Sequence, residues 1–226
     1  FEIVEADINT SSFVWEIDPN NDKRLVQPLA GLKGLGDAAI EQIVANRPFN
    51  DIEEFLFHDD IVYSKLNKKA LDVLCRSGAL NNLMDDRFSG RKHFWSAVAV
   101  DRVYSKKKFL ENIEEYRDEE DFSVEEEIDN PTTLTGIFPM HLVMTQEVRE
   151  RLEANYVPPV SDYDPDLGLV WFIPREIIRK KTKNGKPYWI VAVIDSNSVL
   201  TKFRCWGIVE GKDRIHLNRP YMGRLD

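Results

Sequence analysis

The spacing of apolar residues changes twice along this chain of 226 residues, and each change predicts a different kind of structure. Residues 1–30 alternate apolar and polar side chains around Trp15, which predicts an extended lead-in hairpin. From residue 31 to residue 116 apolar side chains recur at three- and four-residue intervals, as in Ile40, Ile43 and Val44, which predicts amphipathic helices. After residue 166, short runs rich in β-branched and aromatic residues predict strands.

The helical stretch contains its own start and stop signals. The first helix follows Gly36 and should end before Pro48, because the residue before a proline is pushed out of the helical region. A later helix should begin after Asn67, a good capping residue, and end at Gly78. We therefore expect several short helices with well-defined ends.

The carboxy-terminal stretch predicts a small antiparallel β-barrel of the OB type. Asn184-Gly185 is a strong signal for a tight hairpin between the first two strands. Such barrels have five strands. The expected strands cover residues 169–173, 188–194, 201–206, 214–217 and 221–225. The fold class is thus multi-domain α + β, with helices first and an OB-fold second.

Between these two regions lies a concentration of negative charge. Residues 111–130 hold eleven acidic side chains and one basic side chain, Arg117, which accounts for the net charge of −9 of the whole chain. Charge density with few apolar residues predicts a flexible linker. The expected domains are residues 1–30 (lead-in hairpin), 31–116 (helical domain), 117–133 (acidic linker), 134–165 (connecting helix and loop) and 166–226 (OB-fold).

Several classes of protein are disfavoured. No apolar run approaches the roughly 20 residues of a membrane helix, and the acidic start is no secretory signal, so we expect no membrane partner and a cytoplasmic location. The first residue is not Met, and we expect a processed chain or a piece of a longer one. Cys75 and Cys205 are isolated, and the four histidines have no metal-ligand spacing, so we expect no metal site.

The segment Gly31 to Val44, GLKGLGDAAIEQIV, predicts a phosphate-binding loop. Glycines accept positive φ, expected here at Gly36 as well as Gly34, and let backbone N–H groups approach an anion at a helix start. Basic residues at the start of the later helix oppose the helix dipole, which is consistent with an external phosphate. The candidate duplex-binding residues are Lys33, Gly34, Leu35, Gly36, Lys65, Lys68 and Lys69. A plain capped helix and solvated lysines are the alternatives.

The hairpin of the predicted barrel combines cations with aromatic rings. Single-strand binding uses cations for the backbone and rings for stacking bases. The candidate residues are Arg179, Lys180, Lys181, Lys183, Lys186, Tyr188 and Trp189, and Phe203 and Trp206 are further rings beside the basic residues. By strand alternation about half of the aromatic residues in this region should instead belong to the barrel core.

Two stretches together resemble a known family. The stretch GLKGLGDAAIEQIVANRPFNDIEEFL, followed by LNKKALDVLCRSGAL, resembles the tandem helix-hairpin-helix region of the bacterial and phage C-family replicative polymerases, the DNA polymerase III alpha subunits. The later stretch IIRKKTKNGKPYWIVAVID resembles the first hairpin of their OB domain. The resemblance implies that the helical part grips duplex DNA and that the OB domain meets single-stranded template.

The resemblance also implies what this chain does not do. The catalytic carboxylates of the family lie in a palm domain that would precede residue 1, so we expect no catalytic residue, no cofactor and no Mg²⁺ site in this chain. Cellular members carry a sliding-clamp peptide between the two regions. We find no copy between Arg117 and Ile137, which puts clamp binding in doubt and fits a phage protein. The sliding clamp or other replisome proteins stay open as partners.

Two other functions compete with that of a polymerase portion. NAD-dependent DNA ligase also joins an OB-fold to helix-hairpin-helix units, but this sequence has no Lys-x-Asp-Gly for adenylation. A free-standing adaptor of a replication complex, which binds DNA and proteins, stays open.

Overall fold

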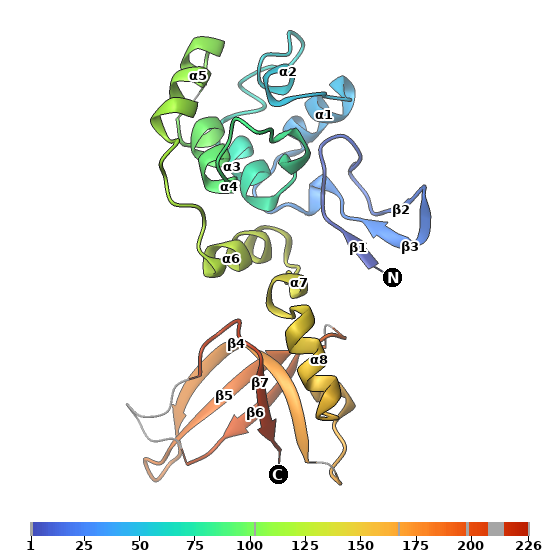
Figure 1. The fold of residues 1–226 in the computed structure, drawn as a ribbon, viewed down its shortest axis with the longest axis vertical. Coiled ribbons are helices and arrows are strands. Elements are labelled where there is room, and N and C mark those ends of the chain that lie inside the picture. The colour runs from blue at the N-terminus through green and yellow to red at the C-terminus, as the bar shows by residue number, and fades with distance from the viewer. Residues whose placement is uncertain (1, 102, 167, 198, 208–214, 226) are drawn as a thin grey trace. The chain divides into compact units, whose positions relative to one another are not determined.

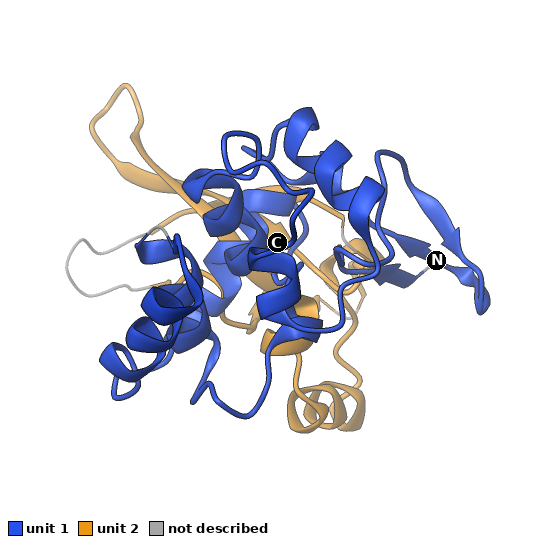
Figure 2. Ribbon diagram, turned by 90° about the horizontal axis from the view of Figure 1, so that it is seen from above, with its two compact units in different colours: residues 1–138 blue, residues 139–226 orange. Residues whose placement is uncertain are grey.

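The structure is a computed structural model, which describes residues 2–101, 103–166, 168–197, 199–207 and 215–225. The chain divides into two compact units, residues 1–138 and residues 139–226, which are coloured separately in Figure 2. A separate hydrophobic core lies within each unit. Within the described residues, no helix combines the length and the apolar character that crossing a membrane requires.

Unit 1 begins with a three-stranded sheet. Its strands are β1 (Glu2–Val4), β2 (Glu16–Asp18) and β3 (Asn21–Val26), in the order β1-β3-β2. β2 and β3 form an antiparallel hairpin, and β1 adds to β3 in parallel. The hairpin agrees with the alternation in the sequence, whereas the pairing of β1 was not predicted.

Short helices make up the rest of unit 1 (Figure 1). They are η1 (Leu29–Gly31), α1 (Asp37–Asn46), α2 (Ile52–Leu56), α3 (Lys68–Ser77), η2 (Asn81–Leu83), α4 (Arg91–Trp95), the π-helical turn η3 (Ser96–Val100), α5 (Lys106–Glu115) and α6 (Val124–Thr135). The predicted boundaries of α1 and α3 are confirmed. α1 ends two residues before Pro48, the Asn67 side chain accepts the N–H of Ala70, and Gly78 ends α3 in the left-handed conformation with φ 87°.

The helices enclose one apolar core. Its largest fully buried side chains include Phe55, Phe94 and Phe109, from α2, α4 and α5. The face of α1 that was predicted to be apolar contributes Ile40 and Ile43, and both are fully buried. Burial of such side chains supplies most of the stability of short helices, which are marginal alone.

The predicted acidic linker is wrong, because residues 124–135 form α6 within unit 1. Ser123 and Glu126 form a capping box at its start, and Ile128 and Leu134 are buried. The helix packs against α3, and Glu127 forms an ion pair with Arg91. Glutamates in the first turn of a helix interact favourably with its dipole, so this charge run stabilises order rather than preventing it.

Unit 2 combines short helices with a curled antiparallel sheet (Figure 1). The helical elements are α7 (Met140–Val143), α8 (Gln146–Ala154) and η4 (Val160–Asp162), and the Thr145 side chain caps α8. The strands are β4 (Leu169–Lys181), β5 (Pro187–Ile194), β6 (Thr201–Cys205) and β7 (Tyr221–Arg224), in the order β6-β5-β4-β7. The predicted tight hairpin joins β4 to β5, and Gly185 has φ 75°.

The sheet forms a half-barrel, which confirms the expected mixed α and β fold class with an OB-like second part. Four of the five expected strands are present in the described residues. Residues 215–217 are not a strand, and residue 214 of that expected strand lies outside the described residues. The core of the half-barrel includes Val170, Val191 and Val193, which are fully buried.

Candidate nucleic-acid interface

The loop that precedes α1 has one glycine, not two, in the conformation that only glycine adopts easily. Gly34 has φ 96°, in the left-handed region. Gly36 is the N-cap of α1, with an extended backbone at φ −88°. A Cβ atom built on Gly36 would meet nothing within 4 Å. The expectation of positive φ at Gly36 is therefore wrong, and the conformational requirement belongs to Gly34.

Backbone N–H groups of this loop are available to a ligand. Lys33 and Leu35 use theirs within the protein, donating to the carbonyls of Leu134 (2.8 Å) and Leu32 (3.1 Å). Four others have no acceptor among the described residues, and all are exposed: Gly34, Gly36, Asp37 and Ala38. Unpaired N–H groups at a helix start favour an anion.

The side chains of the loop differ in their exposure to a ligand. Leu35 is 8 % exposed and packs in the core of unit 1, so it holds the loop in place and offers no side chain to a ligand. Lys33 is exposed. Asp37 lies in the first turn of α1. Its carboxylate interacts favourably with the helix dipole there and would repel a phosphate.

The structure brings one of the predicted lysines of α3 to the loop. A Cβ atom on Gly34 would lie 3.3 Å from Cε and 3.8 Å from Nζ of Lys69, so this ammonium group lies beside Gly34, one of the residues whose N–H has no acceptor. Lys68 is the first residue of α3, and Lys65 is exposed just before it. Lys33, Lys65, Lys68 and Lys69 form no ion pair with any described residue.

A second basic run in unit 1 differs because its lysines form ion pairs. Three consecutive lysines at the start of α5 each pair with a carboxylate, at N–O distances of 3.6, 3.8 and 3.8 Å. These residues are Lys106, Lys107 and Lys108. Because their charges are already partly compensated, they are poorer candidates for phosphate contacts.

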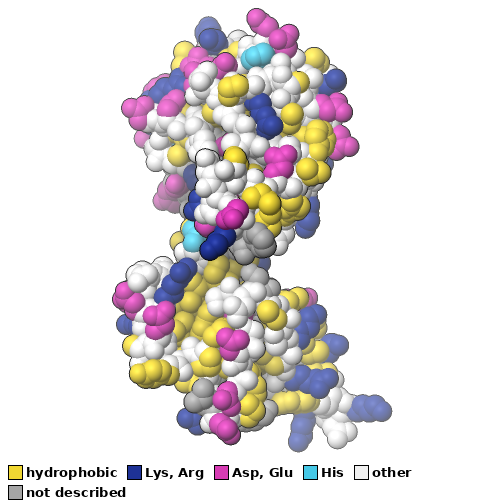
Figure 3. Space-filling model, turned by 90° about the vertical axis from the view of Figure 1, so that its right-hand side faces the viewer, with side chains coloured by type: hydrophobic (Ala, Val, Ile, Leu, Met, Phe, Trp, Pro, Cys, Tyr) yellow, Lys and Arg dark blue, Asp and Glu magenta, His cyan; other side chains and the backbone are white. Residues whose placement is uncertain are grey.

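In unit 2, Lys and Arg side chains gather over the protruding β4–β5 hairpin (Figure 3). Exposed cations along it are Arg179, Lys180, Lys181, Lys183 and Lys186. None of the five forms an ion pair within the described part of the chain. The hairpin is therefore a local basic surface, as the sequence predicted.

The two aromatic residues assigned to this hairpin face opposite sides of the sheet. Trp189 is 7 % exposed and belongs to the half-barrel core, so its predicted role in stacking bases is wrong. The Arg179 guanidinium lies 5.6 Å from the Trp189 ring centre and packs on it. Tyr188 lies beside Lys180 in the strand register and stacks on Trp206, with ring centres 4.7 Å apart.

Trp206, which the sequence also placed beside the basic residues of this region, has a side chain that is 60 % exposed. It directly follows β6, whose register places Cys205 opposite Trp189. Strand alternation separates the two faces of a strand but does not say which face is covered. Because Cys205 lies opposite the buried Trp189, the next residue, Trp206, lies on the other, uncovered face.

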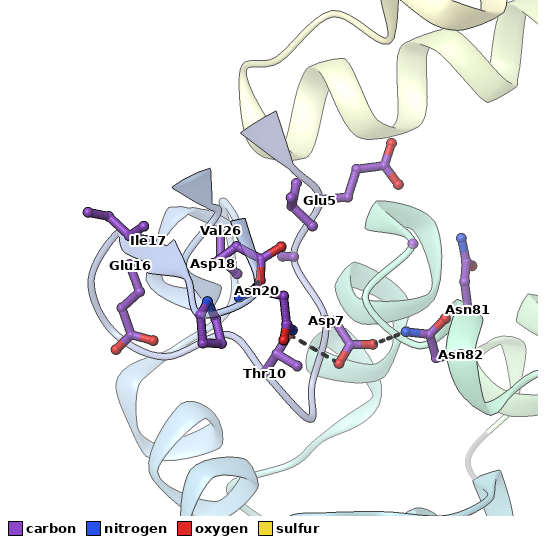
Figure 4. A pocket seen from close by; sticks show the side chains of 14 residues that line it. Glu5, Asp7, Thr10, Glu16, Ile17, Asp18, Asn20, Val26, Asn81 and Asn82 are labelled. Atoms are coloured by element: carbon purple, nitrogen blue, oxygen red, sulfur yellow. Dashed lines mark hydrogen bonds between the residues drawn. The ribbon is translucent and has the colours of Figure 1, made fainter. Parts of the chain in front are cut away.

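A hollow on unit 1 is unsuited to nucleic acid. This pocket of about 730 Å³ lies beside the β2–β3 turn and is lined by Glu5, Asp7, Glu16 and Asp18 (Figure 4). The Asn82 amide donates a hydrogen bond to Asp7 at 2.7 Å. Its carboxylates would repel phosphate.

No group of side chains in the described residues is arranged to hold a metal ion. Burial raises the pKa of the Cys75 thiol, which keeps it protonated and unreactive. The Gly34 loop with α3 and the β4–β5 hairpin are thus the candidate binding surfaces among the described residues.

Comparison with known proteins agrees with the geometry of unit 1. Residues 1–89 match the model of a family described as helix-hairpin-helix motif. The Gly34 loop and α1 to α3 lie within this match. The first part of the chain is therefore a helix-hairpin-helix region.

The chain is similar to alpha subunits of bacterial DNA polymerase III. The chain is 34 % identical over 105 residues to DNA polymerase III subunit alpha of Pseudomonas aeruginosa, which is 45 % of this chain and 9 % of that protein. It is 39 % identical over 80 residues to that of Pseudomonas fluorescens (34 % and 6 %) and 38 % identical over 65 residues to that of Helicobacter pylori (27 % and 5 %). The resemblance to DNA polymerase III alpha subunits is thus confirmed for a helix-hairpin-helix portion. The matched segments span less than a tenth of each relative.

Proposed function

We propose that this chain is a DNA-binding, non-catalytic portion of a replicative polymerase, and that unit 1 grips duplex DNA by its backbone. The supporting observation is the Gly34 loop, which has exposed N–H groups without acceptors and has the Lys69 ammonium beside Gly34. Contacts of this kind bind phosphate without reading bases. The match to the helix-hairpin-helix family and the polymerase relatives supports the same function.

The half-barrel is proposed to bind single-stranded template through the β4–β5 hairpin. The five cations of the hairpin would contact phosphates, and Tyr188 would offer a ring edge near Lys180. The stacked pair of Tyr188 and Trp206 replaces Trp189 in this role, because Trp189 is buried. Cations beside exposed rings are the usual means of binding single strands.

A matched pair of triple variants tests the duplex contact. In the first, Lys65, Lys68 and Lys69 are replaced by Gln; in the second, Lys106, Lys107 and Lys108 are replaced by Gln. Both lose three positive charges, but only the second removes lysines that are paired with carboxylates. Duplex affinity is measured by fluorescence anisotropy at several salt concentrations.

We expect the first variant to bind at least about tenfold more weakly and to lower the slope of log affinity against log salt by roughly 0.9 for each phosphate that a lysine no longer neutralises. The second variant should bind nearly as well as the parent. Equal losses in the two variants would reduce the interaction to net charge and overturn the assignment to the Gly34 loop and α3. Primer extension by either variant or the parent would contradict the non-catalytic role.

A further inference from the structure

The half-barrel has two free edges that border one cleft. β6 and β7 are the outermost strands of the order β6-β5-β4-β7, and no described strand pairs with the outer edge of either. A cleft of about 930 Å³ is lined by residues of both, including Phe203, Arg204, Gly223 and Arg224. Free strand edges present backbone N–H and C=O groups that can pair with a further strand.

The core beneath this cleft is incompletely covered. Val170 and Val191, on the inner strands, are fully buried. On the edge strands, Phe203 and Tyr221 face the same core but are only half-buried. The Phe172 ring lies 4.9 Å from that of Phe203 and also lines the cleft. An apolar floor between two strand edges has the shape that the inward side chains of an added strand would fill.

The rim of the cleft is positively charged. Lys202, Arg204 and Arg224 line it, and all three are exposed. No described carboxylate lines the cleft, and none of these cations forms an ion pair with a described residue. Along each edge strand the cations alternate with the inward-facing residues, for example Arg204 after Phe203. A complementary strand would therefore alternate apolar and acidic residues.

We propose that this cleft binds an extended polypeptide strand from outside residues 1–226, with carboxylates at alternate positions. The strand would add to the edges of β6 and β7, place apolar side chains on Phe172 and Phe203, and place carboxylates beside Arg204 and Arg224. OB-folds have five strands, so the added strand completes the barrel. A nucleic acid could contact the same cations, but it cannot continue a backbone ladder along a strand edge.

The probe is a seven-residue peptide of alternating valine and glutamate, blocked at both ends and added to the isotopically labelled chain. Binding is measured by calorimetry, and amide chemical shifts locate it. Two control peptides carry methyl groups on alternate backbone nitrogens, or lysine in place of glutamate. A single-stranded thymidine oligomer is added separately as a competitor of the acidic peptide. The cleft variant is Arg204→Glu with Arg224→Glu, and its matched control is Lys183→Glu with Lys186→Glu.

We expect the acidic peptide to shift amides of β6 and β7 and the methylated and lysine peptides to bind at least roughly tenfold more weakly. The cleft variant, once its amide spectrum shows an intact fold, should lose about tenfold in affinity, and the hairpin variant less than about twofold. Absence of binding, or equal binding of the methylated peptide, would overturn the proposal. Displacement of the peptide by the thymidine oligomer from the same amides would overturn it in favour of a nucleic-acid cleft.

Discussion

Replacement of Gly34 and Gly36 by alanine, one at a time, tests the loop in detail. An alanine at position 34 must adopt φ 96°. Its Cβ atom would lie 3.3 Å from Lys69 Cε and 3.4 Å from Val73 Cγ2. The left-handed conformation costs a non-glycine residue about 1–2 kcal/mol, and the Lys69 side chain can move away. At Gly36 the backbone is extended and the space is open, so only a weaker N-cap opposes the gain from a less flexible unfolded chain.

Gly34→Ala should therefore lower the free energy of unfolding by about 1–2 kcal/mol and Gly36→Ala should change it by less than about 0.5 kcal/mol. Urea unfolding followed by circular dichroism measures both. If the displaced loop also loses one phosphate hydrogen bond, of about 1.5 kcal/mol, duplex affinity of Gly34→Ala falls roughly tenfold. Anisotropy is measured without urea, where both variants stay folded.

The comparison has a clear refuting result. If Gly36→Ala loses more duplex affinity than Gly34→Ala at equal folded fraction, the left-handed glycine is not what shapes the site. Equal affinity of both variants and the parent would mean that the loop only joins η1 to α1.

Other predictions concern parts whose roles the structure changed. Ser123→Ala should lower stability by about 1 kcal/mol and Leu134→Ala by about 2–5 kcal/mol in thermal unfolding, because α6 belongs to the core; a flexible linker would tolerate both. Arg87 forms ion pairs with Asp85 (2.8 Å) and Glu53 (2.7 Å), so Arg87→Met should lower the free energy of unfolding at pH 7, and by less at pH 3. Arg87 lowers the pKa of Asp85, so its contribution is present above the unfolded pKa and is lost as pH falls through the folded one. Trp189→Ala should unfold the half-barrel, at a cost of about 3–5 kcal/mol, seen as lost amide dispersion.

Local signals predicted much of the fold. The ends of α1 and α3 followed from Pro48, Asn67 and Gly78, because a proline, a capping side chain and a left-handed glycine act through their own backbone. The β4–β5 hairpin followed from Asn184-Gly185 for the same reason. These features depend on a few neighbouring residues, which a sequence displays directly.

The errors came from features that depend on distant partners. The acidic run was interpreted by composition, although Ser123-x-x-Glu126 is a capping box that marks a helix start in the sequence itself. What composition could not show is that Leu134 enters the core of unit 1. Trp189 and Trp206 were both expected beside the basic residues, but Trp189 is buried and Trp206 is exposed, because the covered face of β5 is set by β4 and β6.

For the candidate site, the sequence picked out segments that the structure brings together, but not how their residues are oriented. Lys33 is exposed in the glycine loop, and Lys69 of α3 lies beside Gly34. That Gly34 alone is left-handed, and that Leu35 points into the core, depends on how the loop leaves η1 and enters α1. Two glycines separated by one residue look equivalent in a sequence, and only the backbone path distinguishes them.

The hydrogen bond from the Lys33 N–H to the Leu134 carbonyl has a consequence for synthesis on the ribosome. The ribosome makes the chain from its amino terminus, so the Gly34 loop is synthesised early. The Leu134 carbonyl that holds it is added about a hundred residues later, and such distant pairings form late in folding. Until α6 has emerged, the loop lacks this tether. Unit 1 should therefore acquire its binding surface only as its last helix is made, which delays DNA contact by the nascent chain.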